Sequence, residues 1–294
     1  MEELETRELA YFVAVARELS FSRAAERLGM AQPPLSRAIQ RLERRLGVRL
    51  LERDSRGTTL TAAGDVLLRE AGTVLEALSA AALRTRRAGR SEPRLVLAMK
   101  PGGDGGLLPA VLRAYAAEPG AYEVDVLFGF GERAAMLRDG RADAALVHLP
   151  RERLDGLAHV DLLVEPQVVV LPRGHRLAGR PTVRLADLDG EPQPTWPHLS
   201  GATGPPIQDL GQLVQLVTLG RMVAVVPASV SRHLGDELTC VPVVDAPPTT
   251  LALAWPEQSR SPALACFVRV AENVAENAVV DAVENAAECE KHRR

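Results

Sequence analysis

Residues 21–47, FSRAAERLGMAQPPLSRAIQRLERRLG, decide the fold of the N-terminal part of the chain. The pattern predicts a short helix over residues 22–28, with Ser22 as its N-cap and Gly29 as the left-handed residue that ends it. Pro33 and Pro34 then open a longer helix, because proline is tolerated in the first turn. Helical spacing places four apolar residues on one face of that helix, namely Leu35, Ile39, Leu42 and Leu46.

The opposite face of the longer helix is polar and basic, with Ser36, Arg37, Gln40, Arg41 and Arg44. Arginine pairs with guanine edges and glutamine with adenine, whereas hydroxyl groups and further arginines hold phosphates. Two helices joined by a tight glycine-containing turn therefore indicate a helix-turn-helix whose second helix enters the major groove. The alternative is a solvated basic helix packed inside a larger domain.

The flanking segments favour the DNA-binding interpretation. A helix is predicted from about Glu5 to Leu19, and the segment VRLLERDSRGTTLT (48–61) has two β-prone runs around a turn, which is typical of a wing. One long helix follows from Ala62 to about Ala88, and a hinge is expected at residues 90–93. Its apolar residues recur at heptad-like spacing, which predicts a dimer seam formed by Leu67, Ala71, Val74, Leu78 and Ala81.

Length and charge agree with a DNA-binding domain joined to at least one further domain. The 294 residues suggest two or three domains, and the net charge is −3. The segment 17–60 is nevertheless basic, with ten arginines against five acidic residues. The three cysteines lie far apart, which predicts neither a disulfide framework nor a zinc site. No secretory signal and no membrane-spanning run is evident, so we expect a cytoplasmic protein without a membrane partner.

Beyond Pro93, strand-like and helix-like runs alternate, which predicts parallel βαβ units. The strand-like runs are RLVLAM (94–99), EVDVLF (123–128), ADAALVHL (142–149), QVVVLP (167–172), MVAVVP (222–227) and LALAW (251–255). Helix-like runs follow at residues 107–117, 132–140 and 210–220. Loops rich in proline and glycine are expected at 191–206 and 246–248.

These motifs resemble one known family. The stretch FSRAAERLGMAQPPLSRAIQRLERRLGVRLLER (21–53), with LTAAG (60–64), closely resembles the signature of LysR-type transcriptional regulators, and weaker similarity extends to about residue 270. The resemblance implies mixed α+β and α/β architecture: a winged helix-turn-helix over 1–61, a linker and dimerisation helix over 62–90, and a periplasmic-binding-protein-like effector domain over 91–294. Subdomain I would comprise about 91–150 and 255–275, and subdomain II about 151–254.

The resemblance also implies partners and contact residues. The expected partners are double-stranded promoter DNA, a small-molecule effector, a second or further copies of the chain in a homodimer or homotetramer, and RNA polymerase. The residues expected to contact DNA are Ser22, Arg23, Gln32, Pro33, Pro34, Ser36, Arg37, Gln40, Arg41, Arg53 and Arg56. Leu51 replaces the Phe that is common in the family, and Met222 replaces a common Gly. Lys100 stands where a small hydroxyl residue is usual.

Candidate effector contacts are Lys100, Gly102, Gly103, Gly129, His148, Thr195 and Trp196. The glycine-rich loop PGGDGG (101–106) could receive an anionic group beside Lys100, or Lys100 could instead pair with Asp104 or point to solvent. Gly129 begins a G-x-G-x-x-A pattern, which we interpret as a strand-to-helix turn that lines the pocket rather than a dinucleotide site. His148 is a ligand contact or a hydrogen-bonded hinge residue. Thr195 and Trp196 form a pocket wall or a loop that covers a core.

Two other functions are weighed against a regulator. The effector half alone would suit a solute-binding protein, but the helix-turn-helix and the lack of a signal peptide oppose this. An enzyme would need a site such as G-x-S-x-G or H-E-x-x-H, and neither motif is present. We therefore predict no catalytic residue, no metal ligand and no cofactor.

Overall fold

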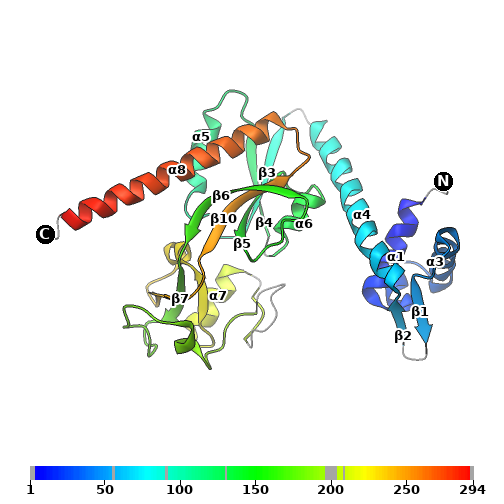
Figure 1. Cartoon of the computed structure of the whole chain (residues 1–294), viewed down its shortest axis with the longest axis horizontal. Coiled ribbons are helices and arrows are strands. Elements are labelled where there is room, and N and C mark those ends of the chain that lie inside the picture. Colours follow the sequence, from blue (N-terminus) through cyan, green and yellow to red (C-terminus); the bar gives the residue numbers. More distant parts are fainter. Residues whose placement is uncertain are drawn as a thin grey trace. The chain divides into compact units, whose positions relative to one another are not determined.

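The computed structural model describes residues 4–54, 57–89, 92–129, 131–195, 204–207 and 209–291 (Figure 1). At positions 53, 54, 88 and 279–291 the description covers the backbone alone. The chain forms two compact units. One comprises Met1–Arg86 with Arg138–Gly140, and the other comprises Arg87–Leu137 with Arg141–Arg294.

The N-terminal unit is a helix-turn-helix with an antiparallel hairpin and a long helix. Its elements are α1 (Thr6–Glu18), α2 (Phe21–Arg27), α3 (Gln32–Leu46), β1 (Leu51–Asp54), β2 (Gly57–Leu60) and α4 (Ala62–Ala88). The core is formed where α1, α2 and α3 meet, around Phe12, Leu35, Ile39 and Leu42. These residues are almost fully excluded from solvent, so the predicted apolar face of α3 is confirmed.

The predicted helix ends are correct at two glycines and wrong at one cap. Gly29 and Gly47 have φ of +64° and +69°, the left-handed conformation that ends α2 and α3. The N-cap of α2 is Ser20, not Ser22, and its hydroxyl oxygen accepts a hydrogen bond from the Arg23 N–H at 3.4 Å. Phe21 is buried in the core, and its burial starts the helix one residue earlier than the polar pattern suggested.

Thr61 and Gly64 join the wing to α4. The Thr61 hydroxyl accepts from the Gly64 N–H at 3.0 Å, which caps α4. A side chain at Gly64 would place its Cβ 2.1 Å from the Leu50 carbonyl oxygen. The glycine of the LTAAG motif is therefore needed for the close approach of α4 to the start of the wing.

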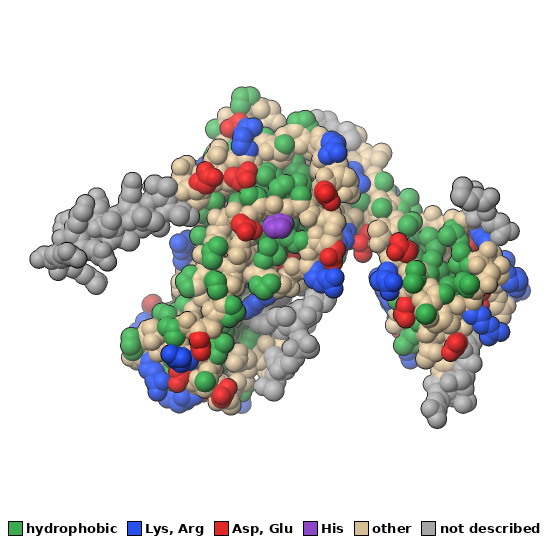
Figure 2. Space-filling view, viewed as in Figure 1, with side chains coloured by type: hydrophobic (Ala, Val, Ile, Leu, Met, Phe, Trp, Pro, Cys, Tyr) green, Lys and Arg blue, Asp and Glu red, His purple; other side chains and the backbone are tan. Residues whose placement is uncertain are grey.

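The predicted apolar stripe on α4 divides between two surroundings. Ala71 is buried in the core of the N-terminal unit, and Leu67 packs against the same core. Val74 and Leu78 remain about half exposed. Val66 is equally exposed but lies on a different side of α4. Hydrophobic side chains are accordingly visible on the surface of this unit in Figure 2. Of the predicted stripe, Val74, Leu78 and Ala81 are exposed and form the candidate seam, whereas Leu67 and Ala71 belong to the core of the unit.

The C-terminal unit contains two sheets. Its elements are β3 (Arg94–Met99), α5 (Leu108–Ala116), β4 (Glu123–Phe128), α6 (Arg133–Arg138), β5 (Ala144–Leu149), β6 (Leu157–Glu165), β7 (Gln167–Pro172), η1 (Leu185–Leu188), α7 (Leu210–Thr218), β8 (Ala224–Pro227), η2 (Ala228–His233), β9 (Leu238–Pro242), β10 (Thr249–Pro256) and α8 (Pro262–Lys291). The first sheet has the strand order β4-β3-β5-β10-β6, and the second has the order β8-β7-β9.

The first sheet has helices on both faces. Side chains of α5 and α8, including Tyr115 and Phe267, form one core with Leu97 and Leu251. Side chains of α6 form a separate core on the other face, around Leu137. The strand order reverses at β3, because β4 lies on one side of β3 and β5 on the other. In open α/β sheets, the crevice beyond the carboxyl ends of the strands at such a switch point is the common ligand site.

Parallel pairing, predicted for the whole C-terminal half, joins β3 with β4 and with β5; outside these strands the described residues have two isolated parallel bridges, Val183 with Val243 and Thr195 with Pro206. The strands of the second sheet are antiparallel, as are the pairs of β10 with β5 and with β6. The subdomain limits also need correction. Strands β6 and β10 belong to the first sheet, so the crossovers lie between Glu165 and Gln167 and before Thr249, rather than near 150 and 255.

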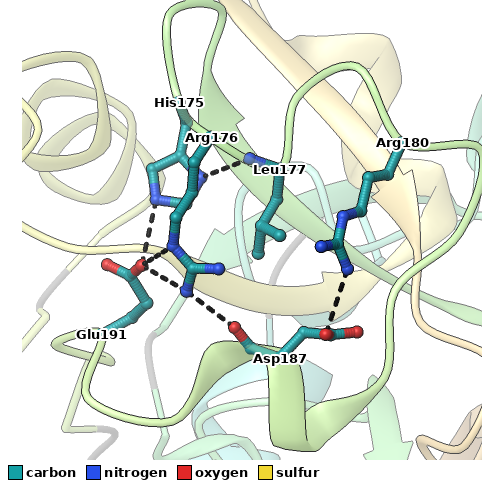
Figure 3. Close-up of polar contacts among 6 residues, drawn as sticks. All are labelled: His175, Arg176, Leu177, Arg180, Asp187 and Glu191. Carbon is teal, nitrogen blue, oxygen red and sulfur yellow. Dashed lines mark hydrogen bonds and ion pairs between the residues drawn. The ribbon is translucent and has the colours of Figure 1, made fainter.

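A polar network fixes the loop that follows β7 (Figure 3). Glu191 accepts from Arg176 at 3.0 Å and lies 3.2 Å from the Nε2 of His175. Because His175 Nδ1 accepts from the Leu177 N–H, its proton is on Nε2 and points to Glu191. Asp187 completes the network by pairing with Arg180 at 3.1 Å. These contacts are all made within residues 175–191, so the network fixes the conformation of the loop itself.

Candidate DNA-binding surface and effector site

The polar face of α3 is open to solvent. Gln32, Pro33, Arg37, Gln40 and Arg41 are exposed, and Pro34 and Ser36 are half-buried. Within the described residues, the Arg37, Gln40 and Arg41 side chains form no ion pair or hydrogen bond with the protein. Their donors are therefore available to base edges and phosphates while the apolar face of the same helix anchors it.

Two carboxyl groups hold α3 in place, and the sequence analysis did not identify either. Glu8 on α1 is buried and pairs with Arg45 on α3 at 2.9 Å. Glu43 accepts from the backbone N–H groups of Leu50 and Leu51, at 2.9 and 3.2 Å. Glu43 therefore connects the recognition helix to the first strand of the wing.

We expect Glu43→Ala to lower the free energy of unfolding by about 2 kcal/mol, because it leaves two backbone donors near the wing without their charged acceptor. Operator binding should weaken as well, since the wing loses its link to α3. Urea unfolding of the full chain measures the first effect. Glu26→Ala is the matched control, because Glu26 is exposed and its side chain makes no described contact. Equal stability of the two variants would contradict the role given to Glu43.

The remaining predicted DNA contacts differ in their surroundings. Ser22 and Arg23 are exposed at the start of α2. Arg23 lies against Glu18, with 3.4 Å between the charged groups, so part of its charge is neutralised within the protein. The Arg53 backbone belongs to β1, where it pairs with Thr58. Arg56 lies outside the described residues.

Lys100 follows β3 at the edge of the crevice. Its aliphatic stem lies over Gly103, where a Cβ would be only 2.3 Å from the Lys100 Cγ. Burial lowers the Lys100 pKa to about 7; Arg133 and Arg151 lower it further, and Glu152 and Glu165 oppose them. No ion pair between Lys100 and Asp104 occurs in the described structure, so the alternative that they pair is not observed.

His148 is buried near the end of β5, with 2% of its surface exposed. Burial, followed by repulsion from Lys100 and the two arginines, lowers its pKa to about 2, so the ring is neutral. Neither ring nitrogen has a hydrogen-bond partner among the described residues. The predicted hydrogen-bonded hinge histidine is therefore not found. A neutral ring in this position offers one donor and one acceptor to a bound molecule.

Arg133 and Glu152 form a buried ion pair at the same edge. The Arg133 Nε lies 3.1 Å from the Glu152 carboxylate, and a second guanidinium nitrogen also contacts that oxygen. Arg133 donates in addition to the Gly129 carbonyl at 2.9 Å. Gly129 thus acts by orienting an arginine, and a Cβ on it would meet Met136 at 2.4 Å.

The glycine-rich loop contacts both subdomains. A Cβ on Gly105 would lie 3.0 Å from Leu163 and Leu251 of the first sheet. A Cβ on Gly102 would lie 2.9 Å from His233 of η2, and Arg232 of η2 donates to the Gly105 carbonyl at 3.2 Å. The absence of side chains at these positions lets the loop pack between the β6–β10 face and η2.

Thr195 does not present a free hydroxyl group to this crevice. It is half-buried, and its hydroxyl donates to the Gly204 carbonyl at 2.8 Å within its own loop. Trp196 lies outside the described residues. The structure therefore brings together Lys100, Gly102, Gly103, Gly129 and His148 of the predicted effector contacts, and assigns Thr195 a contact inside the loop.

A second cluster of buried polar residues lies where the two subdomains join. Glu165 ends β6, and its cross-strand neighbour is Thr249 at the start of β10. One Glu165 oxygen accepts from the Ser229 N–H at 3.0 Å, and the Gln167 amide donates to the Thr249 hydroxyl. All four side chains are at most 9% exposed. We call Glu165, Gln167, Ser229 and Thr249 the hinge cluster.

The described part of the chain contains several buried polar atoms that lack a hydrogen-bond partner. Among the described residues, the buried side-chain atoms without a hydrogen-bond partner are both His148 nitrogens, Glu152 Oε2, Glu165 Oε2, Gln167 Oε1 and Ser229 Oγ. Such atoms are costly in a protein interior unless a ligand or water satisfies them. Of these residues, only His148 was among the predicted effector contacts. The sequence feature that could have indicated the others is the pair of polar residues, Glu165 and Gln167, between two apolar strands.

The fold and the two sites define a class. A helix-turn-helix with a wing and an open basic face is joined in one chain to a two-sheet unit that has buried, partly unsatisfied polar groups around the ends of β3, β5 and β6. This combination defines a ligand-responsive DNA-binding regulator. In the described chain no helix is both long and apolar enough to cross a membrane, and no group of potential ligands has the arrangement of a metal site.

Comparison with known proteins identifies the family. Residues 6–65 match the model for the bacterial regulatory helix-turn-helix protein of the lysR family, and residues 88–276 match the LysR substrate binding domain. The Hca operon transcriptional activator HcaR of Escherichia coli (strain K12) is 32% identical over 289 residues, which cover 92% of this chain and 97% of HcaR. BudR of Raoultella terrigena is 30% identical over 91% of this chain and 100% of its own.

Comparison with solved structures leads to the same family. CbnR, a LysR family transcriptional regulator, matches with a TM-score of 0.58 at 26% identity, over 92% of this chain and 99% of CbnR. Full-length CbnR in complex with its target DNA matches with a TM-score of 0.51 at 27% identity, over 92% and 100% of the two chains. The protein belongs to the LysR family of DNA-binding transcriptional regulators, in which an N-terminal helix-turn-helix is combined with an effector-binding domain.

Proposed function

We propose that this regulator reads its operator through the N-terminal half of α3 and responds to a small anionic effector bound in the crevice beyond β3 and β5. Two copies joined along α4 would place two recognition helices on two half-sites of promoter DNA. The effector would shift the balance between subunit arrangements and so alter the access of RNA polymerase, which requires it to bind one arrangement more tightly.

The DNA-binding part of the proposal rests on the exposed face of α3. Arg37 and Gln40 lie one turn apart on the surface opposite Leu35 and Ile39, and neither side chain is engaged within the described protein. In helix-turn-helix proteins the first turns of the recognition helix contact base edges. We therefore assign base contacts to Arg37 and Gln40, and phosphate contacts to Arg41 and the wing.

Arg37→Ala or Gln40→Ala should weaken operator binding by about 1–3 kcal/mol, through loss of discrimination at one base position, and should affect random DNA less. The operator can be obtained by sequencing the DNA that copurifies with the protein. Titrations of both DNAs with each variant then separate base contact from phosphate contact. Arg44→Ala, in the last turn of α3, is the control that should affect both DNAs alike. Equal losses on operator and random DNA for Arg37→Ala would contradict the assignment.

The effector part rests on the gathering of unpartnered buried polar atoms at one edge of the sheet. Lys100, Arg133 and Arg151 outnumber the carboxyl groups of Glu152 and Glu165, which act on the same site. Cations in a partly buried site attract an anion more strongly than surface cations do, because water screens them less. The favoured effector is therefore a carboxylic acid or a similar small anion.

We further propose that the protein acts in the cytoplasm and is not an enzyme. The crevice offers cations and hydrogen-bonding groups that can hold an anion, and the neutral His148 is too weakly basic to remove a proton near neutral pH. Turnover of a bound acid by the purified protein would contradict this part of the proposal.

A further inference from the structure

The hinge cluster has its own unfilled hydrogen-bonding capacity. Glu165 Oε2, Gln167 Oε1 and Ser229 Oγ are buried and have no partner in the described structure. The first two are a carboxyl oxygen and an amide carbonyl oxygen, both acceptors, so they do not satisfy one another. A group that donates hydrogen bonds would satisfy both.

The cluster lies on the same side of the first sheet as His148. Cross-strand partners point to the same face, and His148 pairs with Leu251 on β10, two residues from Thr249. Glu165 pairs with Thr249, so its side chain also lies on that face. The loop that begins at Lys100 packs on the same face, because a Cβ on Gly105 would lie 3.0 Å from Leu163, two residues before Glu165, and from Leu251, the cross-strand partner of His148. The crevice is therefore cationic towards Lys100 and rich in acceptors towards the hinge cluster.

We propose that the effector is bifunctional: besides its anionic group it carries a hydroxyl or ammonium group, which donates hydrogen bonds to Glu165 Oε2 and Gln167 Oε1. The inference rests on the proposed effector site and specifies its ligand class as a small hydroxy acid or amino acid. An acid without a donor would leave the hinge-cluster acceptors unsatisfied, and sites of this kind discriminate strongly against such analogues.

The position of Glu165 gives this contact a consequence for signalling. Glu165 is the last residue of β6 in the first sheet, and its other oxygen holds the Ser229 N–H at the start of η2 in the second subdomain. A donor bound to Oε2 would therefore attach to the residue that already links the two subdomains. Binding at this point favours one relative arrangement of the subdomains, which is what a ligand needs in order to shift a conformational equilibrium.

The test uses the full chain and linear monocarboxylic acids of increasing length, each in an unsubstituted, an ω-hydroxy and an ω-amino form. Calorimetry should find a chain length at which a donor-bearing acid binds wild type about tenfold more tightly than its unsubstituted counterpart. In Glu165→Gln, whose carbonyl can still accept from Ser229, that ratio should fall, and most for the ω-amino acids, because their ammonium group meets an amide donor in place of a carboxylate oxygen. Glu191→Gln, at a carboxyl group in the separate network of Figure 3, is the matched control and should keep the ratio.

Gln167→Met provides a second variant if Glu165→Gln does not fold, because it removes Oε1, the other proposed acceptor; it should reduce the ratio. The inference is overturned if no donor-bearing acid binds wild type more tightly than its counterpart, or if the ratio survives both substitutions. Lys100→Met separates this result from the proposed effector site, because it should weaken every acid in the series. If Lys100→Met binds the acids more weakly but wild type shows no preference for donor-bearing acids, the proposed anion site is supported and only the hinge-cluster contact is refuted.

Discussion

Val74→Asp combined with Leu78→Asp should convert the protein to a monomer and lower its operator affinity by about 10²–10⁴-fold. Val74 and Leu78 are 49% and 53% exposed on α4, and burying them against a second copy would remove apolar surface from water. Introduced carboxylates would face their counterparts across the seam and repel them. The loss on DNA follows because two linked domains bind two half-sites at a high effective concentration, whereas a monomer binds only one.

Sedimentation of wild type and the double variant measures the assembly, and titration of the operator measures the affinity. Ser79→Asp is the control for charge and helix propensity, because Ser79 is exposed next to Leu78 but on a different side of the helix. Leu67 and Ala71 are unsuitable for this test, since substituting them would disturb the core of the N-terminal unit. An intact dimer of the double variant would refute the seam.

The division of the α4 stripe shows what hydrophobic periodicity can and cannot predict. Spacing indicated an apolar face through Leu67, Ala71, Val74 and Leu78, and all four residues do lie along one side of the helix. Periodicity does not indicate what covers that side. The first half packs against the chain's own helix-turn-helix, and only the second half is left for another copy.

The helix-turn-helix was predictable because its signals are local. Gly29, Pro33 and Gly47 act on the backbone within a turn of their own positions, so sequence neighbours suffice to place the ends of α2 and α3. The same reasoning failed at Ser20, because the choice between two serines depends on the burial of Phe21 against other helices.

The hinge cluster could not be predicted in the same way. Glu165, Ser229 and Thr249 come from three distant segments, and their association depends on the register of β6 with β10 and on the position of η2. Similarly, Arg133 was passed over in a motif interpreted as a turn, although its guanidinium is central to the charge of the crevice. Lys100 was identified because it stands where the family usually has a small hydroxyl residue. The charged residues around it became known only from the structure.

Lys100→Met should abolish the response of DNA binding to an acid that binds wild type, because it removes the cation but keeps most of the side-chain length over Gly103. Affinity for the acid in wild type should also depend on pH. Since the Lys100 pKa is about 7, the amine is mostly protonated at pH 6 and mostly neutral at pH 8. Binding an anion favours the charged form, so affinity is greatest below the pKa and falls as the pH rises through 7.

The groups facing Lys100 are Arg133, Arg151, His148, Glu152 and Glu165. Of these, His148 remains neutral from pH 6 to 8, because its pKa is about 2. We therefore expect the dissociation constant to rise about tenfold over that interval in wild type, as titration of a single group with a pKa near 7 requires. Calorimetry across this range with the tightest-binding acid should show the rise, and Lys100→Met should bind weakly with a flat profile. If the variant bound the acid as tightly as wild type at pH 6, Lys100 would have no role in holding the effector.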